Sequence, residues 1–105
     1  MTTYFFVAAS EKFLTVEEPL EEILKERERN YKENNKKIDF WLLKKPLFLQ
    51  TTQFVDLKSK IPSPTAAVIS TDKKFITFLK LRLEFVAVGE FEFPNAEITD
   101  PFKVE

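Results

Sequence analysis

The alternation of apolar and polar residues along the chain predicts four strands and two long helices. Short runs rich in β-branched and aromatic residues, typical of strands, occupy residues 4–9, 38–43, 65–70 and 86–93. Apolar residues at helical spacing occupy residues 19–34 and 72–84, and residues 54–59 have the composition of a further short helix. This order predicts an α+β fold, an antiparallel four-stranded sheet with packed helices in the β-α-β-β-α-β ferredoxin-like order.

The length and the two chain ends set the expected extent of this fold. With 105 residues and no linker or repeat, the chain has the size of a single domain. We expect the core to span about residues 3–93, and residues 94–105, with two prolines, to form a loosely packed tail. In the last strand the alternation changes phase at Gly89, which predicts a bulge there.

Composition argues against an enzyme. The chain has no cysteine and no histidine, which removes thiolate nucleophiles, imidazole bases and the usual protein ligands of zinc and haem iron. Its single glycine cannot build a phosphate-binding loop. The acidic residues Glu17, Glu18, Glu21 and Glu22 lie at a predicted helix N-terminus, where the helix dipole favours them. The sequence therefore predicts a protein without catalytic residues, metal or cofactor.

Charge and hydropathy narrow the class of partner. Sixteen basic and seventeen acidic residues give a net charge of −1, without the basic excess typical of nucleic-acid-binding proteins. The chain does not open like a signal peptide, and its first apolar run is far shorter than the ~20 residues that cross a bilayer. We expect a soluble intracellular protein that binds no nucleic acid. Twelve phenylalanines exceed what so small a core needs, which indicates that some of them face a partner.

Arg82 interrupts the apolar pattern of the second long helix. On a helical wheel it projects from the middle of the apolar arc formed by Phe75, Phe78 and Leu79. A guanidinium there either extends to solvent from the helix end, or meets a carboxylate or an open groove. Arg27 interrupts the first helix in the same way, and we interpret it as a long side chain that reaches solvent.

Asp39 interrupts the second predicted strand. By the two-residue period it shares a sheet face with Trp41, while Ile38 and Phe40 point to the other face. One interpretation is that Asp39 keeps an edge strand soluble. The other pairs Asp39 with Arg82 as a polar spot inside an aromatic surface, typical of protein-binding hot regions, where tryptophan and arginine are enriched.

Several segments, in this order and spacing, resemble a known family over most of the chain. They are Ser10-x-Lys12-Phe13-Leu14, Glu17-Glu18-Pro19, Leu24-Lys25-Glu26-Arg27, Ile38-Asp39-Phe40-Trp41, Val68-Ile69-Ser70-Thr71, Arg82-Leu83-Glu84, Gly89-Glu90-Phe91 and Asp100-Pro101. The family is the small accessory protein of the aerobic magnesium-protoporphyrin IX monomethyl ester cyclase of cyanobacteria and plastids. Residues 50–61 do not match this family, so the resemblance implies nothing about them.

This resemblance implies a non-catalytic role in chlorophyll biosynthesis. In the family, the protein supports the oxidative cyclase that makes protochlorophyllide, whose di-iron chemistry resides in a separate, membrane-associated catalytic subunit. The implied partner is that subunit, with this chain peripheral to the thylakoid membrane in a cyanobacterial cytoplasm, or in the plastid stroma. The family's binding patch corresponds here to Ala9, Asp39, Phe40 and Arg82, and Trp41 joins these candidates through its predicted face.

Two other functions fit the same residues. An aromatic-lined cavity could carry a flat ligand such as a tetrapyrrole, although an axial metal ligand would then have to be tyrosine, lysine or a carboxylate. Alternatively, the surplus phenylalanines could be buried in a homodimer, since the sequence does not fix the oligomeric state. The absorbance of the purified protein separates a pigment carrier from an accessory protein.

Overall fold

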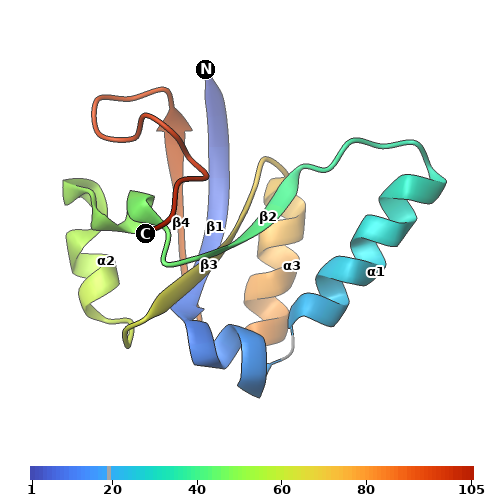
Figure 1. Cartoon of the computed structure of the whole chain (residues 1–105), viewed down its shortest axis with the longest axis horizontal. Helices are drawn as coiled ribbons and strands as arrows, with labels where there is room; N and C mark the ends of the chain where they lie inside the picture. The colour runs from blue at the N-terminus through green and yellow to red at the C-terminus, as the bar shows by residue number, and fades with distance from the viewer. Residues whose placement is uncertain (19) are drawn as a thin grey trace.

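The computed structural model describes residues 1–18 and 20–105 and places helices on both faces of one sheet (Figure 1). The strands are β1 (Thr2–Ser10), β2 (Phe40–Lys44), β3 (Thr65–Ser70) and β4 (Ala87–Phe93). The α-helices are α1 (Leu20–Glu33), α2 (Val55–Ser59) and α3 (Lys73–Leu83), with a π-helical turn at Phe13–Glu17 and 3₁₀ turns at Leu47–Gln50 and Thr52–Phe54. The predicted helix start at Pro19 lies outside the described residues. Among those described, no helix is both long and apolar enough to cross a membrane.

The sheet has the order β2-β3-β1-β4, and every neighbouring pair of strands is antiparallel. The predicted α+β fold with an antiparallel four-stranded sheet is therefore confirmed. The two central strands pair from Phe5↔Ser70 to Ser10↔Thr65. All residues of β3 are buried, because helices or turns cover both faces of the sheet there.

One face of the sheet is covered by α1 and α3, which stand side by side on the right of Figure 1. The helix α3 lies against β1 and β3 and buries four apolar side chains, Phe75, Ile76, Leu79 and Leu83. The helix α1 is more polar and fully buries only Leu20 and Tyr31, while Ile23 and Leu24 are partly buried. Apolar packing therefore fixes α3 more firmly than α1.

The opposite face carries an aromatic core beneath α2 and the 3₁₀ turns. Phe6 is fully buried at its centre, with ring centroids 4.9 Å from Phe48 and 5.1 Å from Phe54 in edge-to-face geometry. This core uses several of the surplus phenylalanines. Phe78 and Phe85 lie outside this core, and their side chains are 50% and 81% exposed.

The strand β4 is regular, so the predicted bulge at Gly89 is wrong. It pairs with β1 in one continuous register from Thr2↔Phe93 to Ala8↔Ala87. Position 89 requires glycine because the Phe6 ring lies against it: a Cβ atom there would lie 2.5 Å from Cζ of that ring. The apparent change of phase arises from Val88, an apolar residue that is 45% exposed on the same face as Glu90 and Glu92.

The segment after β4 is packed against the body, so the prediction of a loosely packed tail is wrong. Its end lies beside the 3₁₀ turns that follow β2 (Figure 1), where Val104 forms a β-bridge with Pro46. The Phe102 ring lies 4.5 Å from that of Trp41. Ile98, from the same segment, is 2% exposed within the aromatic core.

Candidate docking groove between α1 and α3

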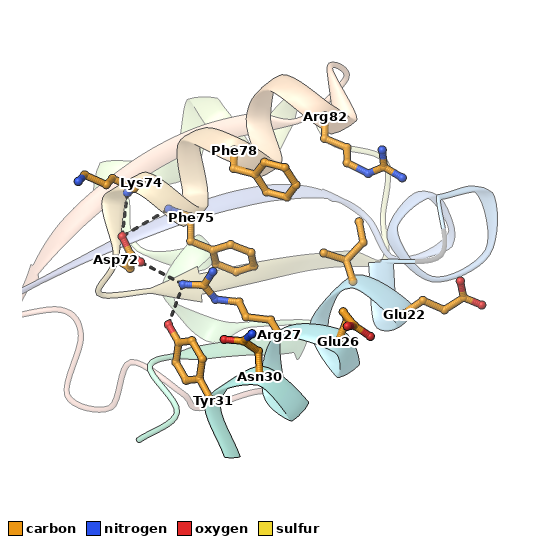
Figure 2. A pocket seen from close by; sticks show the side chains of 11 residues that line it. Glu22, Glu26, Arg27, Asn30, Tyr31, Asp72, Lys74, Phe75, Phe78 and Arg82 are labelled. Carbon is orange, nitrogen blue, oxygen red and sulfur yellow. Dashed lines mark hydrogen bonds and ion pairs between the residues drawn. The ribbon is translucent and has the colours of Figure 1, made fainter. Parts of the chain in front are cut away.

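A groove of about 730 Å³ lies between α1 and α3 on the helical side of the sheet. Figure 2 looks into it and shows the lining side chains extending from both helices. Ile23, Phe75 and Phe78 provide apolar surface, and charged side chains from each helix surround them.

Side chains one helical turn apart form each wall of the groove. On α3, Lys74, Phe78 and Arg82 follow one another at four-residue spacing and therefore lie along one line of the helix. On α1, Glu22 and Glu26 have the same spacing. Figure 2 shows Phe78 and Arg82 reaching from α3, with Glu22 and Glu26 on the other helix. Apart from Arg27 and Asp72, the charged side chains that line the groove are thus basic on α3 and acidic on α1.

Arg27 joins the two helices at one end of the groove (Figure 2). Its guanidinium donates to Oδ2 of Asp72 at 3.0 Å and to the hydroxyl of Tyr31 at 2.7 Å. The same group lies 3.9 Å from the ring centroid of Phe75 and 5.4 Å from that of Phe40, within the range of cation–π attraction. The side chains of Arg27 and Asp72 are only 24% and 31% exposed, so solvent screens this ion pair less than a surface pair.

Tyr31 extends this network to Asp39. The Tyr31 hydroxyl accepts the hydrogen bond from Arg27 and donates its own to Oδ1 of Asp39 at 2.9 Å. The backbone carbonyl of Asp39 accepts from the Thr71 amide at 3.2 Å and from the Ser70 hydroxyl at 2.8 Å. Asp39 therefore ties the last turns of α1 to the end of β3.

Asp72 holds Arg27 and also caps α3. Its Oδ1 accepts from the backbone amides of Lys74 at 3.0 Å and Phe75 at 3.4 Å, which satisfies donors left open at the start of the helix. The Asp72 amide in turn donates to the Ser70 hydroxyl at 2.9 Å. The end of the groove is therefore fixed by hydrogen bonds at the start of α3 as well as by the ion pair.

The polar groups of the network bind one another, apart from the buried Nε of Arg27, which has no hydrogen-bond partner among the described residues, and other charged groups of the groove remain available to a partner. Arg27, Tyr31 and Asp72 bind one another, whereas Lys74 and Arg82 have no carboxylate within ion-pair distance among the residues described. Among the residues that the structure describes, no three His, Cys, Asp or Glu side chains lie close enough together to hold a metal ion. The arrangement is suited to binding by apolar contact and charge.

Comparison with known proteins places the chain in a family. The family model described as Ycf54 protein matches residues 2–93. The chain belongs to the Ycf54 family. The sequence segments quoted above resemble this same family, so that identification is confirmed.

Relatives of the Ycf54 family occur in cyanobacteria and plastids. The Ycf54-like protein of Synechocystis sp. is 52% identical over 101 residues, which span 96% of this chain and 76% of that protein. The chloroplastic YCF54 protein of Arabidopsis thaliana is 40% identical over 92 residues, 87% of this chain and 43% of that protein. An X-ray structure of a protein from Nostoc sp. PCC 7120 matches with a TM-score of 0.95 at 53% identity, covering 98% of this chain and 95% of that one.

Three of the site residues predicted from the Ycf54 resemblance lie on the helical side, but only Arg82 lines the groove. Arg82 is exposed on the α3 wall. Phe40 is 5% exposed and lies beneath the guanidinium of Arg27. Asp39 lies behind Tyr31 and is partly buried. Asp39 and Phe40 therefore support the groove from below, while Arg82 can touch a partner.

Ala9 and Trp41 lie away from the groove. Ala9 is buried in β1, paired with Ala66 of β3. Trp41 packs on the opposite face of the sheet against Phe102. The prediction that Trp41 and Asp39 share a face is wrong, because β2 begins at Phe40 and Asp39 precedes it. Outside the strand, Asp39 is free to turn its side chain toward α1.

The aromatic group around Trp41 includes the tyrosine with a shifted pKa. Tyr4 stacks on Phe91 at 5.6 Å and tilts against Trp41 at 6.5 Å. Burial raises the pKa of Tyr4 above its usual value of 10.0, and the nearby carboxylate of Asp100 raises it further. Both effects disfavour the phenolate in the folded protein.

The buried arc of α3 is centred away from Arg82, so the prediction that Arg82 projects from its middle is wrong. The arc consists of the buried Phe75, Ile76, Leu79 and Leu83. Phe78 and Arg82 lie at its edge, where it opens onto the groove. The interpretation that paired Arg82 with Asp39 is wrong, since the ion pairs among the described residues are Arg27–Asp72 and Arg29–Glu26.

Sequence reasoning missed Arg27, Tyr31, Asp72 and Phe78 as site residues. Arg27 and Tyr31 are four residues apart on one helical stripe, which was a signal that they could meet. Asp72 was recognisable as a helix cap. Its contact with Arg27 joins residues 45 apart, which no local pattern reveals.

Proposed function

We propose that this protein is a non-catalytic accessory protein that binds and supports the di-iron catalytic subunit of the magnesium-protoporphyrin IX monomethyl ester cyclase, and that the subunit docks over the α1–α3 groove. Family membership and the resemblance of the segments quoted above support the choice of partner. One observation carries the choice of surface: Phe78, 50% exposed, and Arg82 stand one turn apart on an open groove wall. Phenylalanine and arginine are enriched at protein–protein interfaces, and arginine is among the residues that most often dominate their binding energy.

In this proposal Asp39 and Phe40 act by holding the groove in shape. Asp39 orients Tyr31, and Phe40 lies under Arg27, which ties α1 to the start of α3. A surface that is already ordered loses less conformational entropy on binding and therefore binds more tightly. Replacing Asp39 should weaken docking through the position of α1 rather than through a lost contact.

The proposed role contributes to protochlorophyllide formation without chemistry of its own. The chain contains neither histidine nor cysteine, so it lacks the side chains most used for general acid–base and thiolate catalysis. Its association with the thylakoid membrane would be peripheral and would occur through the catalytic subunit.

Affinity capture from a membrane extract of the native host tests this function. A tagged copy of the chain should retain the cyclase catalytic subunit, identified by mass spectrometry. The matched control is the double variant Phe78→Ala/Arg82→Ala, which changes two exposed side chains and should keep the fold but lose the subunit. Absence of the subunit from the wild-type eluate would contradict the proposed function.

A second candidate function, carriage of a flat pigment, is favoured by the size of the groove. Its volume of about 730 Å³ lies within the range of small-molecule sites, roughly 300–1,000 Å³, and Phe78, which is 50% exposed, offers an aromatic ring. Titration with magnesium-protoporphyrin IX monomethyl ester, followed by pigment absorbance, distinguishes the two functions. A shift that saturates at one pigment per chain would support carriage, and an unchanged spectrum would exclude it.

A further inference from the structure

We propose that the groove receives an amphipathic helix of the partner, with basic residues along one edge of its apolar face and acidic residues along the other. This inference rests on the proposed function and specifies the kind of segment that the partner supplies. It follows from three features of the groove: the elements that build it, its apolar surface and the distribution of its charges.

The groove favours a helix over an extended segment. Its lining comes from α1, α3 and the capping residue Asp72, so both walls are helices whose backbone groups are bonded internally. An extended segment would find no strand edge there to pair with its own amides and carbonyls. A helix satisfies these groups itself and presents only side chains to the groove.

The groove offers an apolar surface that the apolar face of a docking helix can cover. The rings of Phe75 and Phe78 are stacked with centroids 6.4 Å apart, and Ile23 faces them from α1. Phe75 is 4% exposed and lies at the bottom of the groove, whereas Phe78 is 50% exposed and lies on its open wall. Apolar residues at successive turns of one helix face can cover such a surface.

The two walls carry opposite charge, which constrains the partner further. Glu22 and Glu26 line the α1 side, and Lys74 and Arg82 line the α3 side. Among the described residues, the Arg27–Asp72 pair closes one end of the groove, and no ion pair joins Glu22 or Glu26 to Lys74 or Arg82. A uniformly basic or acidic segment would be attracted by one wall and repelled by the other. A helix with Lys or Arg toward α1 and Asp or Glu toward α3 is attracted by both.

Reversing the charge of each wall separately tests this arrangement. The affinity of the purified cyclase catalytic subunit is measured for the wild-type chain, Glu22→Lys/Glu26→Lys and Lys74→Glu/Arg82→Glu. The control Glu21→Lys/Glu28→Lys makes the same charge change at exposed positions of α1 that do not line the groove. Thermal melting of each variant confirms that it remains folded.

Both wall reversals should weaken binding by at least about tenfold, while the control stays within about twofold of wild type. Tighter binding by one reversal and weaker binding by the other would show a partner of uniform charge and overturn the proposal. Wild-type affinity in both wall reversals would also overturn the proposal. If the wild-type chain itself fails to bind the subunit, the proposed function fails, a result distinguishable from loss of this inference alone.

Overlapping 20-residue peptides that tile the catalytic subunit test whether the occupant is a helix. One peptide should displace the subunit and gain helical circular dichroism when it binds. The same peptide with its acidic and basic residues exchanged should bind the chain with both walls reversed more tightly than it binds wild type. Displacement without a gain in helicity would overturn the helical assignment. So would the absence of any competing peptide when the intact subunit binds.

Discussion

Arg27 on α1 donates a hydrogen bond of 3.0 Å to Asp72, the residue that caps α3. The pair connects two helices that are otherwise separated by the groove, and it closes one end of that groove. Because the apolar anchoring of α1 is concentrated at Leu20 and Tyr31, this polar contact sets much of the distance between the groove walls.

Replacement of Arg27 should therefore loosen α1. Arg27→Ala removes a charge-assisted hydrogen bond and the cation–π contact with Phe75, and leaves Asp72 without its cation. We expect the free energy of unfolding to fall by about 1–3 kcal/mol, measured by urea denaturation. The control is Arg29→Ala on the same helix, whose pair with Glu26 is 67% and 68% exposed and should contribute less than about 0.5 kcal/mol. Equal effects of the two substitutions would contradict the role assigned to Arg27.

A methyl group at Gly89 should destabilise the sheet. In Gly89→Ala the new Cβ would lie 2.5 Å from Cζ of Phe6, which has no exposed surface and cannot move aside freely. Overpacking of this kind costs about 1–3 kcal/mol, which should appear as a lower melting temperature. The double variant Phe6→Leu/Gly89→Ala removes the clashing ring edge and should lose less stability than the sum of its single changes. Full additivity would argue against the clash.

Stability should fall above about pH 10 because of Tyr4. The folded state raises the pKa of Tyr4 above the value of 10.0 that the unfolded chain retains, so the folded protein binds the phenolic proton more tightly. The resulting contribution is complete below the unfolded pKa and is lost as pH rises through the folded one. Urea denaturation at about pH 9 and about pH 11 should show Tyr4→Phe losing less stability than wild type over this interval. Identical losses would contradict the assignment.

Local patterns predicted the elements, because each depends on neighbouring residues. The strand at Thr65–Ser70 follows from its β-branched and small residues, and the start of α3 follows from the capping ability of Asp72. The packing of Phe102 against Trp41 had no such signal, since it joins segments distant in the sequence. The same holds for Gly89, whose requirement comes from a ring on the neighbouring strand.

Only part of the candidate site was predicted, because some of its residues have a local sequence signal and others are recognised only from their contacts in the fold. Arg82 was recognised because a charge in an apolar helix pattern is visible in the sequence. Arg27 has the same local appearance, and only the fold shows that it meets Asp72 while Arg82 meets no carboxylate among the described residues. The side chain of Asp39 was assigned to the wrong face because the strand begins at Phe40, two residues later than predicted, and Asp39 precedes it.

The affinity of the purified cyclase catalytic subunit for Arg82→Ala tests the central claim, docking on the α3 wall, most directly. Arg82 is exposed, so its removal should leave the melting temperature unchanged. As an interface anchor it should weaken binding by about 30-fold or more, equivalent to ~2 kcal/mol. Arg29→Ala, the loss of an exposed arginine that does not line the groove, should bind as wild type does. Wild-type affinity in Arg82→Ala would contradict docking at this surface.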